Sequence, residues 1–170
     1  MKAWRLSELG DPWDVLKLQE VDSPAPGDGE ARLKVAACDL NFADILQCQG
    51  TYQVRVDPPF TPGMAVAGTV QAAGNGCDLK IGDRVLGMTS SGWGGYAEEA
   101  LVRGSDMRIV PENVSLAAAS AMNVIYGTGW VALHRRGNMQ PGETVLVLAA
   151  AGGVGSAAVQ MAKVHGCKVI

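Results

Sequence analysis

The sequence has no long apolar run and no excess of positive charge. No stretch approaches the ~18 consecutive apolar residues of a membrane-spanning helix, so none is expected. The 14 Lys and Arg against 17 Asp and Glu give a formal net charge of −3, which leaves no basic footprint for nucleic acid. Two Phe and three Tyr beside four Trp make no evident stacking platform for bases. A small-molecule partner is therefore expected, with no nucleic acid and no membrane.

Cysteine and histidine are scarce as well. Four widely spaced cysteines form no C-x-x-C pair, and only two histidines are present. With no apolar leader in the first residues, this favours a reduced, cytoplasmic setting. The simplest interpretation of the cysteines is that they are small, buried or half-buried side chains: Cys38, Cys48, Cys77 and Cys167.

Glycine, in contrast, is abundant. The chain has 22 glycines in 170 residues, where average usage of ~7% would give about 12. Hydrophobic residues make up 48% and charged residues 18%, as in a globular protein. Tight turns and close backbone approaches are therefore expected to matter.

The first ~120 residues predict short strands separated by turns, because apolar positions alternate or run between clusters of proline and glycine. One helix is expected over residues 41–49, and a proline-rich loop over residues 57–63. The strands are predicted at Lys2–Leu6, Val15–Val21, Glu30–Cys38, Val66–Ala72, Arg84–Met88 and Tyr96–Val102.

The pattern changes after that. Helices are predicted at Ser115–Met122, where a serine caps an alanine-rich run, and at Tyr126–Arg135, which Gly137 is placed to stop. The run Thr144–Ala149 is typical of a strand buried on both faces of a parallel sheet. A helix from about Val154 to His165 and a strand from Cys167 onward complete the pattern.

These elements predict an α/β protein with a boundary near residue 123. A β-rich domain is expected over residues 1–123, and the start of a dinucleotide-binding domain over residues 124–170. Two parallel strands cannot bury both faces of a sheet, so we expect that a C-terminal half is missing and that the 170 residues alone are poorly active or inactive.

The turn Ala150-Ala151-Gly152-Gly153-Val154-Gly155 is an A-x-G-x-x-G form of the dinucleotide fingerprint. Small residues let the turn be tight, let backbone N–H groups approach a pyrophosphate, and let the helix pack on the strand. The alternative is a glycine-rich turn that only permits close packing. The acidic ribose ligand of such folds would fall ~20 residues further on, at or beyond residue 170, so the choice between NADPH and NADH stays open.

Six segments in this order resemble the quinone oxidoreductase, or zeta-crystallin-like, branch of the medium-chain dehydrogenases/reductases. They are LNFADILQCQGTY (Leu40–Tyr52), PGMAVAGTV (Pro62–Val70), IGDRVLG (Ile81–Gly87), GGYAEEALV (Gly94–Val102), YGTGWVAL (Tyr126–Leu133) and LAAAGGVGSAAVQMAK (Leu148–Lys163). The resemblance implies a GroES-like catalytic domain followed by the first βα(β) unit of a Rossmann domain. It also implies NADPH as cofactor and a homodimer when the protein is full length.

The resemblance also implies roles for particular residues. Asn41 and Thr128 match positions beside the nicotinamide, and residues 151–155, from Ala151 through Gly152, Gly153 and Val154 to Gly155, match the pyrophosphate loop. Tyr52 lies where related 2-enoyl-thioester reductases carry a proton-donating tyrosine, so Tyr52 and Asn41 are the catalytic candidates. The alternatives are helix caps for Asn41 and Thr128 and a strand-edge packing role for Tyr52. Asp44 is expected to be structural, as helix-surface charge or as a fixed internal partner.

The sequence departs from the family pattern at three positions. Relatives usually carry glutamate where Ala65 stands, and Leu46 and Cys48 replace residues that are often larger or polar. The positions of the zinc ligands of zinc-dependent members hold Asn41, Met64 and Ala65, so no metal is expected.

The expected function is zinc-independent hydride transfer from NADPH to a quinone or another conjugated carbonyl. A 2-enoyl-thioester reductase is the alternative within the enzymes, supported by Tyr52. A protein that holds NADPH without turnover, as crystallin-type relatives do, is the alternative from another class.

Overall fold

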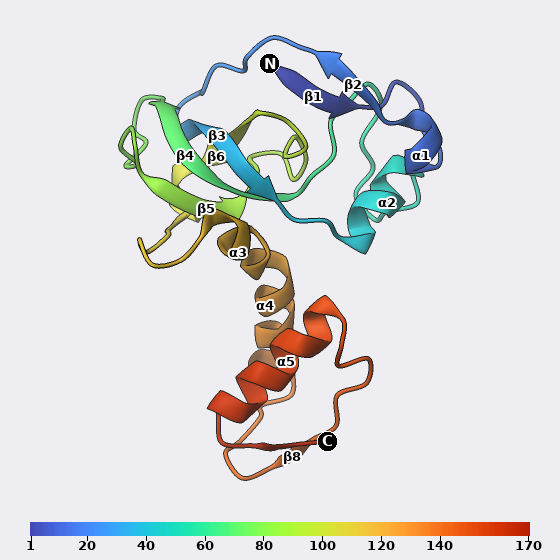
Figure 1. The fold of residues 1–170 in the computed structure, drawn as a ribbon, viewed down its shortest axis with the longest axis vertical. Helices are drawn as coiled ribbons and strands as arrows, with labels where there is room; N and C mark the ends of the chain where they lie inside the picture. The colour runs from blue at the N-terminus through green and yellow to red at the C-terminus, as the bar shows by residue number, and fades with distance from the viewer. The chain divides into compact units, whose positions relative to one another are not determined.

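The computed structural model describes all residues from Met1 to Ile170. The chain divides into two compact units, Met1–Ala121 and Met122–Ile170. The first contains most of the strands and the second a βαβ arrangement (Figure 1). The predicted α/β class is confirmed. None of the helices combines the length and hydrophobicity that crossing a bilayer requires.

Unit 1 is built on a five-stranded antiparallel sheet with the order β6-β3-β4-β5-β7. The two nine-residue strands at its centre place alternate or consecutive apolar side chains in the core, which includes Leu33, Val66 and Val70. The strands are β3 (Glu30–Cys38), β4 (Ala65–Ala73), β5 (Arg84–Met88), β6 (Glu99–Arg103) and β7 (Arg108–Ile109).

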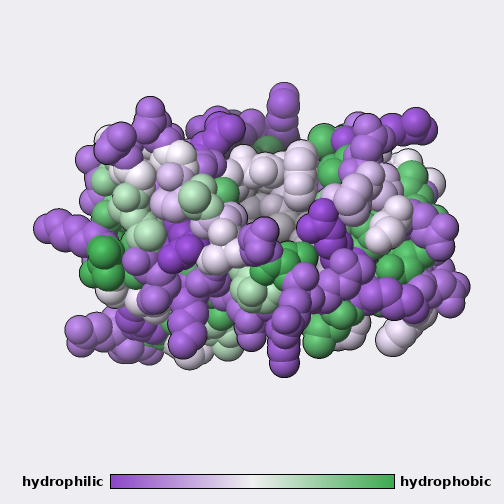
Figure 2. Space-filling model, turned by 90° about the horizontal axis from the view of Figure 1, so that it is seen from above, coloured by the Kyte–Doolittle hydropathy of each residue, from purple (hydrophilic) through white to green (hydrophobic).

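Smaller elements surround this sheet. Strands β1 (Lys2–Arg5) and β2 (Lys17–Glu20) form an antiparallel pair. The remaining elements of unit 1 are α1 (Pro12–Val15), α2 (Phe42–Cys48), the 3₁₀ turn η1 (Gly104–Asp106) and α3 (Leu116–Ser120). Hydrophilic side chains project from much of the face seen in Figure 2, and hydrophobic groups lie between them in separate patches.

Unit 2 begins with α4 (Met122–Trp130), which continues as the π-helical segment η2 (Val131–Arg136). Strand β8 (Thr144–Val145), helix α5 (Gly153–Val164) and strand β9 (Lys168–Val169) follow, and the two strands pair in parallel. The small core of this unit contains Met139, Ala162 and Cys167.

Several predicted boundaries were wrong, each for a local reason. The predicted strand Val15–Val21 starts only at Lys17, because Asp11 caps a short helix that opens with Pro12. The strand expected from Tyr96 starts at Glu99, because Ala97 forms a bridge with Ala3 of β1 instead.

The C-terminal part also differs from the prediction. The helix expected over Ser115–Met122 is capped by Ser115 as predicted, but it ends at Ser120. The following helical segment ends at Gly137, as predicted, but the backbone of this glycine is in the ordinary right-handed region. The residue with a positive φ is Asn138, at 47°. The run Thr144–Ala149 is a strand only over its first two residues. With a single partner strand its outer side chains are not buried, and Leu146 and Leu148 are 65% and 80% exposed.

Candidate functional site

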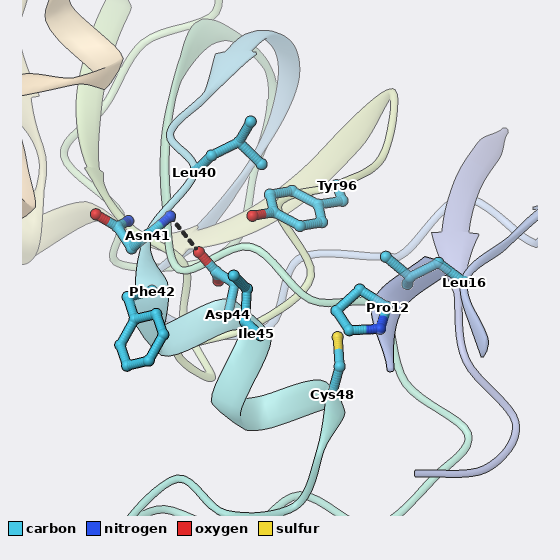
Figure 3. Close-up of a pocket in the computed structure, with 9 residues that line it drawn as sticks. All are labelled: Pro12, Leu16, Leu40, Asn41, Phe42, Asp44, Ile45, Cys48 and Tyr96. Carbon is cyan, nitrogen blue, oxygen red and sulfur yellow. Dashed lines mark hydrogen bonds between the residues drawn. The ribbon is translucent and has the colours of Figure 1, made fainter. Parts of the chain in front are cut away.

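Unit 1 contains a cavity of about 410 Å³ beside α2, which we call the α2 cavity. Most of its lining is apolar, and its polar groups belong to Asn41, Asp44 and Tyr96 (Figure 3). The other lining residues come from α1, the segments after α1 and β3, and α2: Pro12, Leu16, Leu40, Phe42, Ile45 and Cys48. A cavity with an apolar wall and a few polar groups suits a small organic ligand.

Helix α2 places four of the lining residues, and its first turn explains where it starts. Asn41 is the N-cap with extended backbone, and its N–H donates to Asp44 Oδ2 over 2.8 Å. This is the reciprocal contact of a capping box, with Asp in place of the usual Glu or Gln. Gly50 ends the segment with a φ of 69°, a backbone conformation that residues other than glycine rarely adopt. The alternative of Asn41 as a helix cap is therefore observed.

Two carboxyl groups are buried in this region: Asp44 lines the polar end of the α2 cavity, and Asp39 directly precedes the lining residues Leu40 and Asn41. Asp44 is 4% exposed and Asp39 is 9% exposed. Asp44 Oδ1 and both Asp39 oxygens have no hydrogen-bond partner, nor does Asn41 Nδ2. Asp44 is therefore an internal group, and the interpretation of it as helix-surface charge was wrong. Uncompensated burial of this kind is costly for the charged form of a carboxyl.

Burial has the corresponding effect on titration. It raises the pKa of Asp44, while the hydrogen bond from the Asn41 backbone opposes part of the rise. Burial also raises the pKa of Asp39, and the charge of Asp44 adds to that rise. Burial, followed by the charge of Asp44, raises the pKa of Cys48 to about 11. This thiol therefore stays protonated at neutral pH and is no activated nucleophile.

Tyr96 completes the polar end. Its hydroxyl points toward Asn41 and Asp44 in Figure 3, and it is buried without a hydrogen-bond partner. Burial and the neighbouring Asp44 charge raise the pKa of Tyr96, so its hydroxyl remains neutral. Sequence reasoning missed Tyr96 and Asp39 as site residues. The only available signal was the position of Tyr96 within the GGYAEEALV segment.

Tyr52, the predicted proton donor, does not line the α2 cavity. It follows α2, where its backbone N–H donates to Leu46 O over 3.1 Å, and its side chain is half-exposed. Ala65 is fully buried in β4, and its carbonyl oxygen accepts the Asp39 N–H over 3.2 Å. The backbone of Asp39 is thus hydrogen-bonded to the position at which the family resemblance implies a glutamate. No group of three His, Cys, Asp or Glu side chains lies where it could hold a metal ion.

In unit 2 the predicted phosphate turn lies between β8 and α5, with Gly152 as the N-cap of the helix. A Cβ on Gly155 would lie 2.3 Å from Ala149 O, so this position admits no side chain. The first helical bond runs from Ser156 N–H to Gly152 O. The N–H groups of Gly153, Val154 and Gly155 therefore have no acceptor within the helix and are free to meet an anion.

A second cavity, of about 390 Å³, adjoins this turn and is lined by Gly152, Val154 and Gly155 together with apolar residues of the β8 segment. Thr128 is exposed on α4. The next residue, Gly129, is where α4 and α5 approach closely, since a Cβ there would lie 2.2 Å from the Met161 methyl group.

Comparison with known families identifies the family of the chain. The family described as "Alcohol dehydrogenase GroES-like domain" matches residues 27–112. The chain belongs to this family. Within the medium-chain dehydrogenase/reductase superfamily its relatives are quinone-oxidoreductase-like, which confirms the predicted resemblance and the GroES-like and Rossmann-type folds.

A quinone oxidoreductase-like protein 2 homolog of Nematostella vectensis is 40% identical over 99% of this chain and 46% of its own length. The quinone oxidoreductase of Thermus thermophilus, whose structures include a complex with NADPH, is 41% identical with a TM-score of 0.86, over 99% of this chain and 52% of that one. The CurK enoyl reductase is 30% identical with a TM-score of 0.89, over 99% of this chain and 53% of that one. The chain thus spans about half the length of these relatives.

Proposed function

We propose that the complete protein is an oxidoreductase that transfers hydride from NADPH to a quinone or another conjugated carbonyl. The observation that carries the nucleotide part is the turn before α5, where Gly155 admits no side chain and three N–H groups are free. The Thermus thermophilus relative solved with NADPH supports the choice of cofactor. NADH remains the alternative donor to be tested.

The cofactor contacts in this proposal are those that the family resemblance implies. The pyrophosphate accepts hydrogen bonds from the turn of residues 151–155, that is Ala151, Gly152, Gly153, Val154 and Gly155. Asn41 and Thr128 lie beside the nicotinamide, which supplies the hydride when bound. Asn41 and Tyr52 are the proposed catalytic residues. The α2 cavity supports this role for Asn41, whereas the role of Tyr52 rests on the sequence pattern alone.

The reaction is proposed to proceed without zinc. Asn41, Met64 and Ala65 offer neither thiolate, imidazole nor carboxylate at the positions of the metal ligands. Without a Lewis acid the acceptor must be reactive by itself. Quinones and conjugated carbonyls meet this requirement, because the charge of the added hydride spreads onto an oxygen. The four free cysteines support a reducing, cytoplasmic setting, and a homodimer stays a prediction for the full-length protein.

The second candidate is a 2-enoyl-thioester reductase, which the likeness to an enoyl reductase supports. In that case Tyr52 supplies the proton that follows the hydride. A protein that binds the nucleotide without turning it over is the third outcome to be distinguished.

The test is oxidation of NADPH and NADH by the complete protein, each with a 1,4-quinone and with crotonyl-CoA, followed by loss of reduced-nicotinamide absorbance. Quinone-dependent oxidation of NADPH is expected. Faster turnover of crotonyl-CoA, lost in Tyr52→Phe, would establish the enoyl reductase instead. Nucleotide binding without turnover in any pairing would contradict both enzyme assignments.

A further inference from the structure

Asn41, Asp44 and Tyr96 form the polar end of the α2 cavity, and the carboxyl-bearing Asp39 directly precedes the lining residues Leu40 and Asn41. Asp39 and Asp44 are both at least nine-tenths buried, and three of their four carboxyl oxygens have no hydrogen-bond partner. The fourth oxygen accepts the Asn41 backbone N–H, an uncharged donor. Figure 3 shows Asp44 beside Asn41 and Tyr96 at this end of the cavity. Nothing in this arrangement neutralises a negative charge.

The groups around Asp39 and Asp44 supply no positive charge. The titratable groups that face Asp44 are Asp39 and Cys38 at the end of β3, Tyr96 before β6, and Cys48 on α2 itself. The charge of Asp11, the cap of α1, contributes to the raised pKa of Cys48. All of these are neutral or negative, and no lysine, arginine or histidine lines the cavity. A negative potential in a buried, apolar setting is weakly screened, so it acts beyond contact distance.

We propose that the buried carboxyls of Asp39 and Asp44 make the α2 cavity selective for a ring that carries positive charge over an uncharged or anionic one. This inference rests on the proposed function. With the nicotinamide of the cofactor as the ring, the same selectivity favours its oxidised, cationic form over its reduced, neutral form. The site thereby favours release of hydride, because the charge that develops on the donor ring is stabilised. No hydrogen bond from either carboxyl to the ring is required.

The selectivity has a defined pH dependence. Burial raises the pKa of both carboxyls, so they ionise at higher pH than exposed aspartates, whose pKa is about 4. The negative potential grows as pH rises through these raised values. Preference for the cation therefore increases with pH and is weakest in acid.

The first experiment measures the dissociation constants of NADP⁺ and NADPH for the complete protein by calorimetry, at acid and at mildly alkaline pH. Asp39→Asn removes one charge with little change of shape. It is chosen over a change at Asp44 because the Asp44 carboxyl also caps α2. At alkaline pH, the ratio of the two dissociation constants is expected to change roughly tenfold in favour of NADPH binding in the variant. In acid, the ratio is expected to change little.

Asp14→Asn is the matched control. It removes the same charge from an exposed position on α1, where salt and water screen it, so the ratio is expected to stay unchanged. An unchanged ratio in Asp39→Asn, or an equal change in Asp14→Asn, overturns the proposal.

A second experiment is independent of turnover and of dinucleotide binding. It compares binding of 1-methylnicotinamide, a cation, with that of nicotinamide, which is neutral, to the protein and to Asp39→Asn. Tighter binding of the cation, lost in the variant, is expected. Equal affinity, or no binding of the cation, overturns the proposal. If this selectivity is found while no acceptor is reduced, the proposed reductase fails and the cation site stands.

Discussion

At the scale of single residues, Gly152 and Gly155 of the phosphate turn have different steric requirements. A Cβ on Gly155 would lie 2.3 Å from Ala149 O and 2.9 Å from Ala150 Cα, and both of these are backbone atoms. A Cβ on Gly152 would have its only close neighbour at 3.4 Å, and the backbone there has an ordinary φ of −78°. Gly155 is therefore required by packing, whereas Gly152 is not.

We expect Gly155→Ala to destabilise unit 2 by about 1–3 kcal/mol, the usual cost of overpacking. Gly152→Ala, the control in the same turn, is expected to leave the free energy of unfolding within about 0.5 kcal/mol. Urea unfolding monitored by a probe in α5 measures both. Equal losses in the two variants would show that the Ala149 backbone moves aside.

The residues of the candidate site were predictable to different degrees. The fingerprint identified Gly155 because its requirement is local: a helix must pack on the turn that precedes it. Asp39 and Tyr96 could not be identified in this way. They reach the α2 cavity region from the end of β3 and from a segment before β6, and a carboxyl in a sequence carries no sign that it will be buried without a partner.

At the scale of elements, α4 contains two glycines in different surroundings. A Cβ on Gly127 would meet nothing within 4 Å, whereas on Gly129 it would displace the Met161 methyl group of α5. Glycine within a helix costs roughly 0.5–1 kcal/mol relative to alanine when nothing else opposes the change.

Gly127→Ala is therefore expected to stabilise unit 2 by about 0.5–1 kcal/mol. Gly129→Ala is expected to give a smaller gain or a loss, because Met161 must adopt another rotamer. Thermal unfolding followed by circular dichroism compares them. A larger gain from Gly129→Ala than from Gly127→Ala would contradict the close packing of α4 on α5.

Element type was predicted better than element length. Residues 30–38 and 84–88 are strands over the predicted ranges, because each has a partner strand along its length. The apolar run from Thr144 predicts a longer strand than β8, since strand length depends on partners that a local pattern does not contain. The helix α1 was missed although Asp11-Pro12 is a start signal, because four residues are too few to show a helical period.

At the scale of the whole molecule, the two units have cores of unequal size. Unit 1 contains three clusters of buried apolar residues, one of which has eight buried members along the five-stranded sheet. The cluster of unit 2 has three buried members, and its sheet has two strands. Local opening is easiest where few buried contacts hold the backbone.

We therefore expect backbone amides of α5 and β9 to exchange with solvent faster than those of β3 and β4, as measured by hydrogen exchange with mass spectrometry. Gly155→Ala is expected to speed exchange in unit 2 alone, because its steric conflict is confined to that unit. Uniform exchange over both units, or acceleration of β3 and β4 by Gly155→Ala, would mean that the chain opens as one cooperative body. If the units exchange separately, unfolding is not two-state, and each free energy of unfolding must be assigned to one unit.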